Sequence, residues 1–418
     1  MTIKYSELQN VPRLLLEATL KPQQGDRFQP TGFADMGAAR YTLPNGTNML
    51  LMESAQSVAN HMELACCKND KKTLLDELNG LPYIVSMHKS KILTTSYLEA
   101  HRLASPYLLS KEWAKKLSEE MKLKDDYQIN DKAVMGVIFK YDPCSLIHGV
   151  WLGTKNYKNE FSGGRVRVTR MLSGFIEAKN YEIAQSGGTK FDKNAARLTE
   201  TGDAETGYGT LPFHRTEFTA EEITAYFNLD LALLRGYGLH EYGLHENAEH
   251  LLIALALLKV RRFLSTGLRL RTACNLEVVG DIKVVKPDKF TIPDEVTLLA
   301  ECKRLITECN NEKLFADPCI TEVNWEPKKN NVTVTLPVGT TQPEIPNELK
   351  EKVEWKKQGK KDGPKLVLKE QPTEEFVNKI KKLFEGNDAA VKAIDDEIKK
   401  QSSDEDKEES ETGDKGDQ

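Results

Sequence analysis

One helix constrains the fold more than any other segment of this 418-residue chain. Residues 246–264 contain good helix formers, have acidic residues in the first turn and are followed by Gly267, which predicts a helix and its end. From Leu251 to Leu258 the residues are apolar nearly all round the helix, so we expect it to be central and buried. A chain of this length can bury such a core and can form more than one domain.

The segment that follows this helix alternates apolar and charged residues. In a strand, the period of two places Arg269 and Arg271 on one face and the leucines beside them on the other. Residues 164–170 repeat the pattern. The basic residues of this second segment are Arg165, Arg167 and Arg170. A single strand of this kind is more simply explained as a solvated face, but two such strands favour an anionic polymer as the ligand.

The distribution of charge is more informative than the net charge of −5. Residues 402–418 contain eight acidic residues and two lysines, which leaves 56 basic and 55 acidic residues in the rest of the chain. Residues 161–176 and 250–276 contain basic residues and no acidic residue. A nearly neutral protein with local basic stripes can bind RNA less promiscuously than a uniformly basic one.

The patterns along the chain predict an α+β protein. Strands are expected at residues 14–20 and 82–87 and within 165–183, and helices at 49–67, 111–121, 246–264 and 293–310. Residues 186–209 contain two glycine-rich ends and are expected to form a loop. Thr219, with Glu222 three residues later, has the pattern of a capping box and predicts the start of a helix.

The character of the sequence changes beyond residue 290. We expect residues 1–290 to form the main core and residues 291–401 to form an extension with helices and a small β unit. Residues 402–418 have no apolar residue to bury and are expected to be a disordered acidic tail.

Cysteine usage and hydropathy favour a cytoplasmic protein. The seven cysteines include no CxxC pair, and an odd number argues against a disulfide framework, so reduced thiols are expected. No apolar run reaches membrane-spanning length, and the first residues lack the apolar region of a signal peptide. We therefore expect no contact with a membrane.

No motif in the sequence commits the chain to catalysis. His240, His245 and His250 are spaced by five residues, whereas a helical zinc protease motif needs a spacing of four. No P-loop and no GxSxG elbow occurs. A lone histidine, His148 or His214, could act as a general base in RNA cleavage, although a lone histidine is more often a packed residue. We expect no metal and no cofactor.

Several segments, in order along the chain, resemble one protein family. They are Gln29 to Phe33, Glu53 to Asn60, Glu99 to Tyr107, Asp142 to Gly149, Arg170 to Ala178, Ser186 to Lys190, Leu211 to Phe218 and Leu268 to Leu276. Together they are similar to the backbone subunit of type I-G (formerly I-U) CRISPR effector complexes, in the Cas-seven group of the RAMP superfamily. The resemblance covers about residues 12 to 286. Asn275 departs from the acidic residue expected at its position.

The resemblance implies a fold and a function. The fold would be an RRM-like (ferredoxin-like) palm, a β-α-β-β-α-β sheet with large insertions. Copies of such a subunit polymerise along the guide RNA of a Cascade complex and support recognition of target DNA in antiviral defence. The implied partners are crRNA, target DNA, other copies of the chain and other Cascade subunits. Such subunits are not nucleases.

The resemblance also implies which residues contact the guide. The candidates are His101, Arg102, Arg165, Arg167, Arg170, Lys190, Arg269 and Arg271. For each of them an intramolecular salt bridge is an equally good interpretation. Residues 186–209 are a candidate thumb that would reach between bases, and contact between subunits would explain them equally well.

Two other functions remain open from the sequence. The chain could be a RAMP endoribonuclease that processes the guide precursor, with His148 or His214 as the base. It could also be a structural protein whose arginines all form internal salt bridges and which binds no RNA.

Overall fold

The structure is a computed structural model of the chain, and it divides the chain into two compact units, Met1–Trp325 and Glu326–Gln418. For residues 190, 211 and 212 it describes the backbone alone. The residues that the structure describes are 2–33, 35–70, 73–123, 131–153, 161, 166–190, 211–239, 246–326, 332–356, 363–369 and 373–399.

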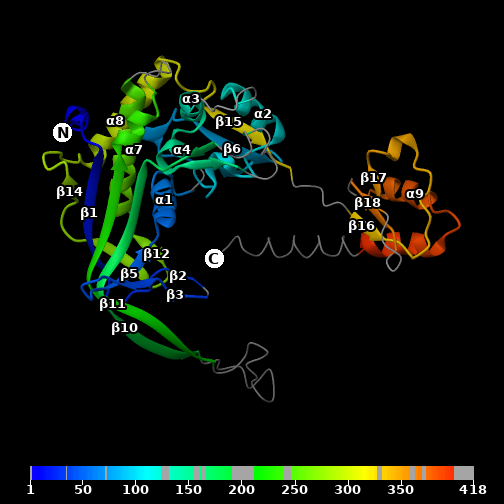
Figure 1. Cartoon of the computed structure of the whole chain (residues 1–418), viewed down its shortest axis with the longest axis horizontal. Helices are drawn as coiled ribbons and strands as arrows, with labels where there is room; N and C mark the ends of the chain where they lie inside the picture. The colour runs from blue at the N-terminus through cyan, green and yellow to red at the C-terminus, as the bar shows by residue number, and fades with distance from the viewer. Residues whose placement is uncertain are drawn as a thin grey trace. The chain divides into compact units, whose positions relative to one another are not determined.

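An antiparallel sheet lies at the centre of the first unit (Figure 1). Its strands are β1 (Arg13–Pro22), β4 (Arg40–Thr42), β5 (Asn48–Glu53), β10 (Leu172–Lys190), β11 (Leu211–Asp230), β12 (Arg269–Arg271), β13 (Cys274–Val278) and β14 (Lys283–Lys286). Their order is β12-β13-β1-β11-β10-β5-β4, and β14 also pairs with β1. The expectation of an α+β fold is confirmed, because this sheet packs against helices.

Two helices complete a β-α-β-β-α-β unit within this sheet. Helix α1 (Ala55–Leu64) lies between β1 and β10 along the chain, and helix α7 (Glu246–Ser265) lies between β11 and β13. The two helices contact each other. The four strands lie in the order β13-β1-β11-β10, with every neighbouring pair antiparallel. This connectivity follows the pattern that the family resemblance implied.

The sheet buries one face because its strands alternate. In β1, Leu14, Leu16, Ala18 and Leu20 are buried, whereas the residues between them are partly or fully exposed. Helix α7 is buried from residue 251 to residue 260 and packs Phe263 against the sheet. The prediction of a central, buried helix is confirmed.

Strands β10 and β11 form a long hairpin. Its ladder runs from Leu172 opposite Leu229 to Lys190 opposite Leu211. The expected loop from residue 186 is therefore wrong for residues 186–190, which are strand, and residues 191–209 of the candidate thumb lie outside the described residues. The capping box expected at Thr219 is also wrong, because Thr219 pairs with Glu182 in this ladder.

The expected helix over residues 49–67 is wrong in its first part. Residues 48–53 form β5, which pairs with β10, and α1 begins only after Ser54. The Ser54 side chain accepts a hydrogen bond from the Ser57 amide at 3.3 Å, which caps the first turn. Tertiary pairing with β10 therefore decides the conformation of a segment whose apolar pattern suits a helix.

A large insertion lies between α1 and β10. Its elements are η2 (Asp76–Leu78), β6 (Tyr83–His88), β7 (Lys91–Thr95), η3 (Arg102–Ala104), α2 (Lys111–Glu120), α3 (Asp131–Tyr141), α4 (Pro143–His148), β8 (Val150–Leu152) and β9 (Val166–Val168). The strand β15 (Ile320–Asn324) returns to this insertion and pairs in parallel with β6. The remaining elements of the first unit are η1 (Tyr5–Glu7), β2 (Gly32–Phe33), β3 (Gly37–Ala38), α6 (Leu231–Gly236) and α8 (Glu295–Asn311).

The division between the units falls later than the boundary expected at residue 290. Helix α8 packs along α7, and β15 pairs with β6, so residues 295–324 contribute to the first unit. The second unit contains β16 (Val332–Thr335), η8 (Asn347–Leu349), β17 (Val353–Lys356), β18 (Lys365–Leu368), α9 (Glu374–Lys382) and a helical segment at residues 388–399. Its sheet has the order β16-β18-β17, and it buries a core of its own that includes Leu366 and Ile380.

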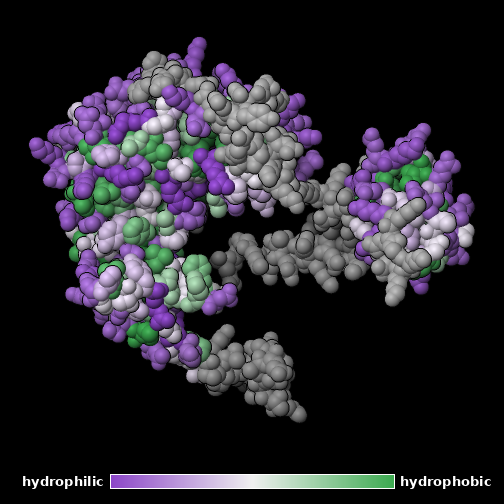
Figure 2. Space-filling view, in the orientation of Figure 1, coloured by the Kyte–Doolittle hydropathy of each residue, from purple (hydrophilic) through white to green (hydrophobic). Residues whose placement is uncertain are grey.

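Further features of the structure are the hydropathy of the surface, the apolar length of the described helices and the state of the cysteines. Figure 2 shows hydrophilic residues over most of the visible face, with hydrophobic ones in separate patches. None of the described helices is long and apolar enough to cross a membrane. The seven cysteines are free thiols in the structure, and all but Cys319 are buried.

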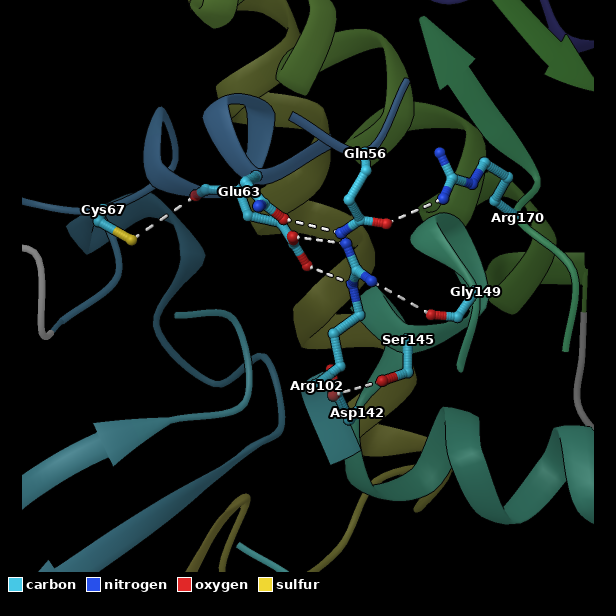
Figure 3. A network of polar contacts seen from close by, with 9 residues as sticks. Gln56, Glu63, Cys67, Arg102, Asp142, Ser145, Gly149 and Arg170 are labelled. Atoms are coloured by element: carbon cyan, nitrogen blue, oxygen red, sulfur yellow. Dashed lines mark hydrogen bonds and ion pairs between the residues drawn. The ribbon is translucent and has the colours of Figure 1, made fainter. Parts of the chain in front are cut away.

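A buried ion pair joins the insertion to helix α1 (Figure 3). The Arg102 guanidinium, in η3, donates from Nε and Nη2 to the two carboxylate oxygens of Glu63 in α1, each at 2.8 Å. Both side chains are almost completely buried. Burial raises the pKa of Glu63, and the charge of the Arg102 guanidinium that faces both oxygens opposes that rise.

The same carboxylate also faces a second buried cation. Lys259 of α7 is 2% exposed, and its charge lowers the pKa of Glu63. Glu63 of α1 therefore binds one cation from the insertion and is stabilised electrostatically by a second, buried cation of the central helix. Removing this carboxylate would leave the buried Arg102 guanidinium without its ion-pair partner.

We expect Glu63→Gln to destabilise the first unit by about 3–5 kcal/mol, the usual cost of breaking a buried ion pair. Urea unfolding followed by circular dichroism measures this change. Glu77→Gln, at an exposed position of η2, is the matched control and should change stability by less than about 0.5 kcal/mol. Equal stabilities of the two variants would contradict the role given to Glu63.

Candidate nucleic-acid interface

A cleft of about 560 Å³ lies where the insertion meets the start of α1. Among the described residues that line it, several are basic or aromatic and none is acidic. They are Gln56, Ala100, His101, Arg102, His148, Gly149, Val150, Trp151, Arg167, Val168, Thr169 and Arg170. The fold thus brings together His101, Arg102, Arg167 and Arg170, four of the eight residues that were predicted to contact RNA.

The strand pair β8–β9 positions one side of this cleft. Trp151 lies directly opposite Arg167 in the antiparallel register. The residues on either side of each are buried, so the alternation turns Trp151 and Arg167 outward. The Arg167 guanidinium carbon lies 4.8 Å from the centroid of the Trp151 ring, over its face. Arg167 makes no hydrogen bond or ion pair with a described residue.

Gly149 allows the two strands to come together at the base of the cleft. Its φ of +81° lies in the left-handed region, and a Cβ there would be 2.8 Å from the Val168 carbonyl oxygen and 2.9 Å from the Arg170 amide nitrogen. The Gly149 carbonyl accepts a hydrogen bond from Nη1 of Arg102 at 3.4 Å. The buried ion pair described above therefore also holds the backbone that forms the cleft (Figure 3).

His148 lies beneath the cleft at the end of α4. Its side chain is almost fully buried, and neither ring nitrogen has a hydrogen-bond partner among the described residues. Burial, followed by the charges of Lys259, Arg102 and Arg170, lowers its pKa well below the ordinary value. The ring is therefore neutral at neutral pH, with one donor and one acceptor nitrogen.

Arg170 and His101 lie at the opening. Arg170 donates from Nη2 to the Gln56 side-chain oxygen at 3.0 Å, a bond between exposed groups (Figure 3). Partial burial, together with the charge of Arg102, lowers the pKa of Arg170. His101 is exposed beside η3. Both side chains can turn toward an anion in the cleft.

Arg102 has a different place from the one predicted. Its guanidinium is buried, and Nε, Nη1 and Nη2 all donate to protein atoms. The alternative that the sequence left open for this residue, an intramolecular salt bridge, is the arrangement in the structure. Arg102 therefore shapes the cleft from below rather than offering donors to a ligand.

Arg269 and Arg271 differ from each other although they share a strand. The alternation is as predicted, because Leu268 and Leu270 are buried. Arg271 forms an ion pair with Glu53 and donates to the Gln29 carbonyl at 3.1 Å, and its partial burial lowers its pKa. Arg269 is exposed and makes no ion pair with a described residue. Of this pair, only Arg269 keeps its donors available.

The other predicted residues lie at or beyond the limits of the described chain. Arg165 is outside the described residues, and the backbone of Lys190 pairs with Leu211 at the far end of the β10–β11 ladder. His240 and His245 are also outside, so the histidine spacing is not tested there. Among the described residues no group of three or more possible ligands could hold a metal ion.

The sequence reasoning missed Trp151 and Gln56 as members of this site. Trp151 stands between two apolar residues, as Arg167 does, and pairing these two short patterns would have placed them opposite each other. Gln56 belongs to the segment Glu53 to Asn60 that carries part of the family resemblance. The structure shows what that segment does, because Glu53 binds Arg271 and Gln56 binds Arg170.

Comparison with known proteins relates part of the chain to one family. Residues 14–183 match the family model described as "CRISPR-associated protein GSU0053 (Cas_GSU0053)". None of the curated proteins matches the chain. A solved structure described as "CRISPR RNA-guided surveillance complex, pre-nicking" is 12% identical, with a TM-score of 0.33, over 63% of this chain and 73% of that chain.

A second solved structure, the crystal structure of Thermofilum pendens Csc2, is 11% identical, with a TM-score of 0.27, over 74% of this chain and 82% of that chain. Both TM-scores are below 0.5, so neither likeness establishes the fold. Every residue that lines the cleft lies within residues 14–183. The cleft therefore belongs to the part of the chain that is similar to this CRISPR-associated family.

Proposed function

We propose that this chain is a non-catalytic, guide-RNA-binding backbone subunit of a CRISPR effector complex, of type I-G. The observation that carries the proposal is the cleft. Within the family-matched residues, His101, Arg167 and Arg170 line one concave surface on which no described residue is acidic. A groove of this kind attracts a polyanion and concentrates it.

The arrangement suits contacts to a sugar-phosphate backbone. Arg167 and Arg170 present guanidinium groups that can bind phosphate oxygens through two parallel hydrogen bonds. Such contacts fix the position of a strand without reading its sequence. In a guide complex, base pairing between guide and target supplies the sequence recognition, so a backbone subunit needs only charge and geometry.

The proposal includes the assembly that this function needs. Several copies of the chain would bind successive stretches of one crRNA in the cytoplasm, together with other Cascade subunits, and present its bases to target DNA. The long β10–β11 hairpin, whose tip lies outside the described residues, is a candidate for contact with the guide or with a neighbouring copy.

A non-catalytic role is favoured by the placement of the two candidate bases. His148 lies under the cleft with a strongly lowered pKa, which makes it a weak base. His214 lies on β11 opposite Gly187, in the β10–β11 hairpin and not among the residues that line the cleft.

We expect Arg167→Ala/Arg170→Ala to weaken binding of single-stranded RNA to a similar extent for all sequences. Removing one phosphate-binding arginine should reduce the magnitude of the salt slope of log K by about 0.7, so the double variant should have a slope smaller by about 1.4. Fluorescence anisotropy at several salt concentrations measures both quantities. The matched control is Lys91→Ala/Lys303→Ala, which removes the same charge from exposed positions elsewhere on the first unit. Equal slopes for both double variants would contradict an RNA site in the cleft.

We expect no cleavage when the purified chain is incubated with labelled CRISPR repeat RNA. Denaturing gel electrophoresis, with and without a metal chelator, detects any product. Metal-independent cleavage that disappears in His148→Ala or in His214→Ala would instead establish the endoribonuclease and overturn the non-catalytic proposal.

A further inference from the structure

The small sheet of the second unit turns one side to its core and the other side outward. Its core side carries the alternate residues of the three strands, which are Val332, Val334, Val353, Trp355, Leu366 and Leu368. Helix α9 covers that side, because its Phe376 and Ile380 belong to the same core. The residues between the core residues point outward, and Thr333 and Thr335 of β16 are exposed there.

Three lysines lie on the outward side, and we call them the lysine face (Lys356, Lys365 and Lys369). Lys356 of β17 lies directly opposite Lys365 of β18 in the antiparallel register. Lys369 belongs to the same side, because it forms an ion pair with Glu354, two residues before Lys356 on β17. Like charges that lie directly opposite each other destabilise a sheet, so the pair Lys356–Lys365 favours a bound anion.

Among the described residues, Glu354 is the acidic partner of two of these lysines. Its carboxylate oxygens lie 3.1 Å from Nζ of Lys369 and 3.6 Å from Nζ of Lys356. The hydrogen bond from Lys369 and the charge of Lys356 lower the pKa of Glu354. Lys365 forms no ion pair with a described residue. Three cations therefore share one carboxylate, which leaves the face with an excess of positive charge.

The sequence supplies an anionic segment next to this unit. Residues 402–418 contain eight acidic residues and two lysines, a net charge of −6, and no apolar residue. They follow the helical segment at residues 388–399, whose Ile394 lies in the same core as Leu366. The acidic segment is therefore attached to the unit that carries the lysine face.

The chain beyond the last described residue is long enough to reach the lysine face. Residues 400–418 can span up to about 63 Å when extended, at about 3.3 Å per residue. A unit of roughly 70 residues has a radius of gyration of about 11 Å, so every part of its surface is within reach. A short tether gives an effective concentration in the millimolar range, at which even weak pairing of opposite charges is populated.

We propose that residues 402–418 dock on the lysine face and shield it, so that any other polyanion must displace them before it binds there. The contact rests on opposite charge and needs no fixed conformation, since the segment has no apolar residue to pack. Shielding keeps the second unit from binding nucleic acid non-specifically. The proposal is separate from the guide-binding function, which concerns the cleft of the first unit.

Carbodiimide crosslinking of the full chain detects the contact, because this reagent joins a carboxylate directly to a lysine amine. We expect mass spectrometry after proteolysis to find peptides from residues 404–417 joined to the lysine face, in yields that fall as salt is raised. A mixture of isotope-labelled and unlabelled chains separates contacts within one molecule from contacts between copies. Crosslinks spread evenly over exposed lysines, or formed only between copies, would overturn the proposal.

An acid-free variant tests the shielding. It replaces the eight acidic residues of 402–418 by Asn or Gln, and it is made in the Arg167→Ala/Arg170→Ala background so that the cleft contributes little to binding. If the segment leaves the face open about one tenth of the time, this variant should bind a short DNA duplex about tenfold more tightly in fluorescence anisotropy. An affinity that does not change would overturn the shielding.

Two triple variants separate shielding from general charge repulsion. One is Lys356→Gln/Lys365→Gln/Lys369→Gln, which removes the lysine face. The matched control removes the same charge from exposed positions elsewhere on the second unit, and it is Lys350→Gln/Lys382→Gln/Lys392→Gln. The gain caused by the acid-free segment should disappear without the lysine face and persist in the control. An equal gain in both backgrounds would show general repulsion and overturn the proposal.

Discussion

The ion pair between Glu63 and Arg102 is the interaction on which the cleft depends. It joins helix α1 to the insertion through two buried hydrogen bonds of 2.8 Å. A third donor of the same guanidinium binds the Gly149 carbonyl and so fixes the turn from which β8 begins. Because an unpaired buried charge is costly, the insertion has one strongly favoured position against α1. The rigid cleft is a consequence of that position.

Three side chains in the segment from β5 to α1 bind arginines from distant parts of the chain. Glu53 binds Arg271, Gln56 binds Arg170 and Glu63 binds Arg102. These contacts divide the predicted RNA-binding residues into two groups. Arg102 and Arg271 neutralise acidic residues within the fold, whereas Arg167 and Arg269 have no acidic partner among the described residues. A local excess of positive charge at the cleft follows from that division rather than from the net charge of the chain.

Local patterns in the sequence predicted those features of the fold that depend on residues close together along the chain. The apolar run in residues 251–258 predicted the buried central helix, and the alternation around Leu268 and Leu270 predicted which side chains of β12 are buried. The ion-pair partners could not be read in the same way, because Glu53 is 218 residues from Arg271. The helix expected at Thr219 failed for a related reason, since pairing with β10 across a long hairpin overrides a local capping pattern. Trp151 was missed because its role exists only when Arg167 lies opposite it.

Ultraviolet crosslinking of bound guide RNA, followed by mass spectrometry of the crosslinked peptides, tests the central claim most directly. The account predicts that crosslinked nucleotides map to peptides that contain His101, Trp151 or Arg167, which converge only in the folded cleft. Crosslinks confined to residues 326–418, with none in the peptides that line the cleft, would contradict it.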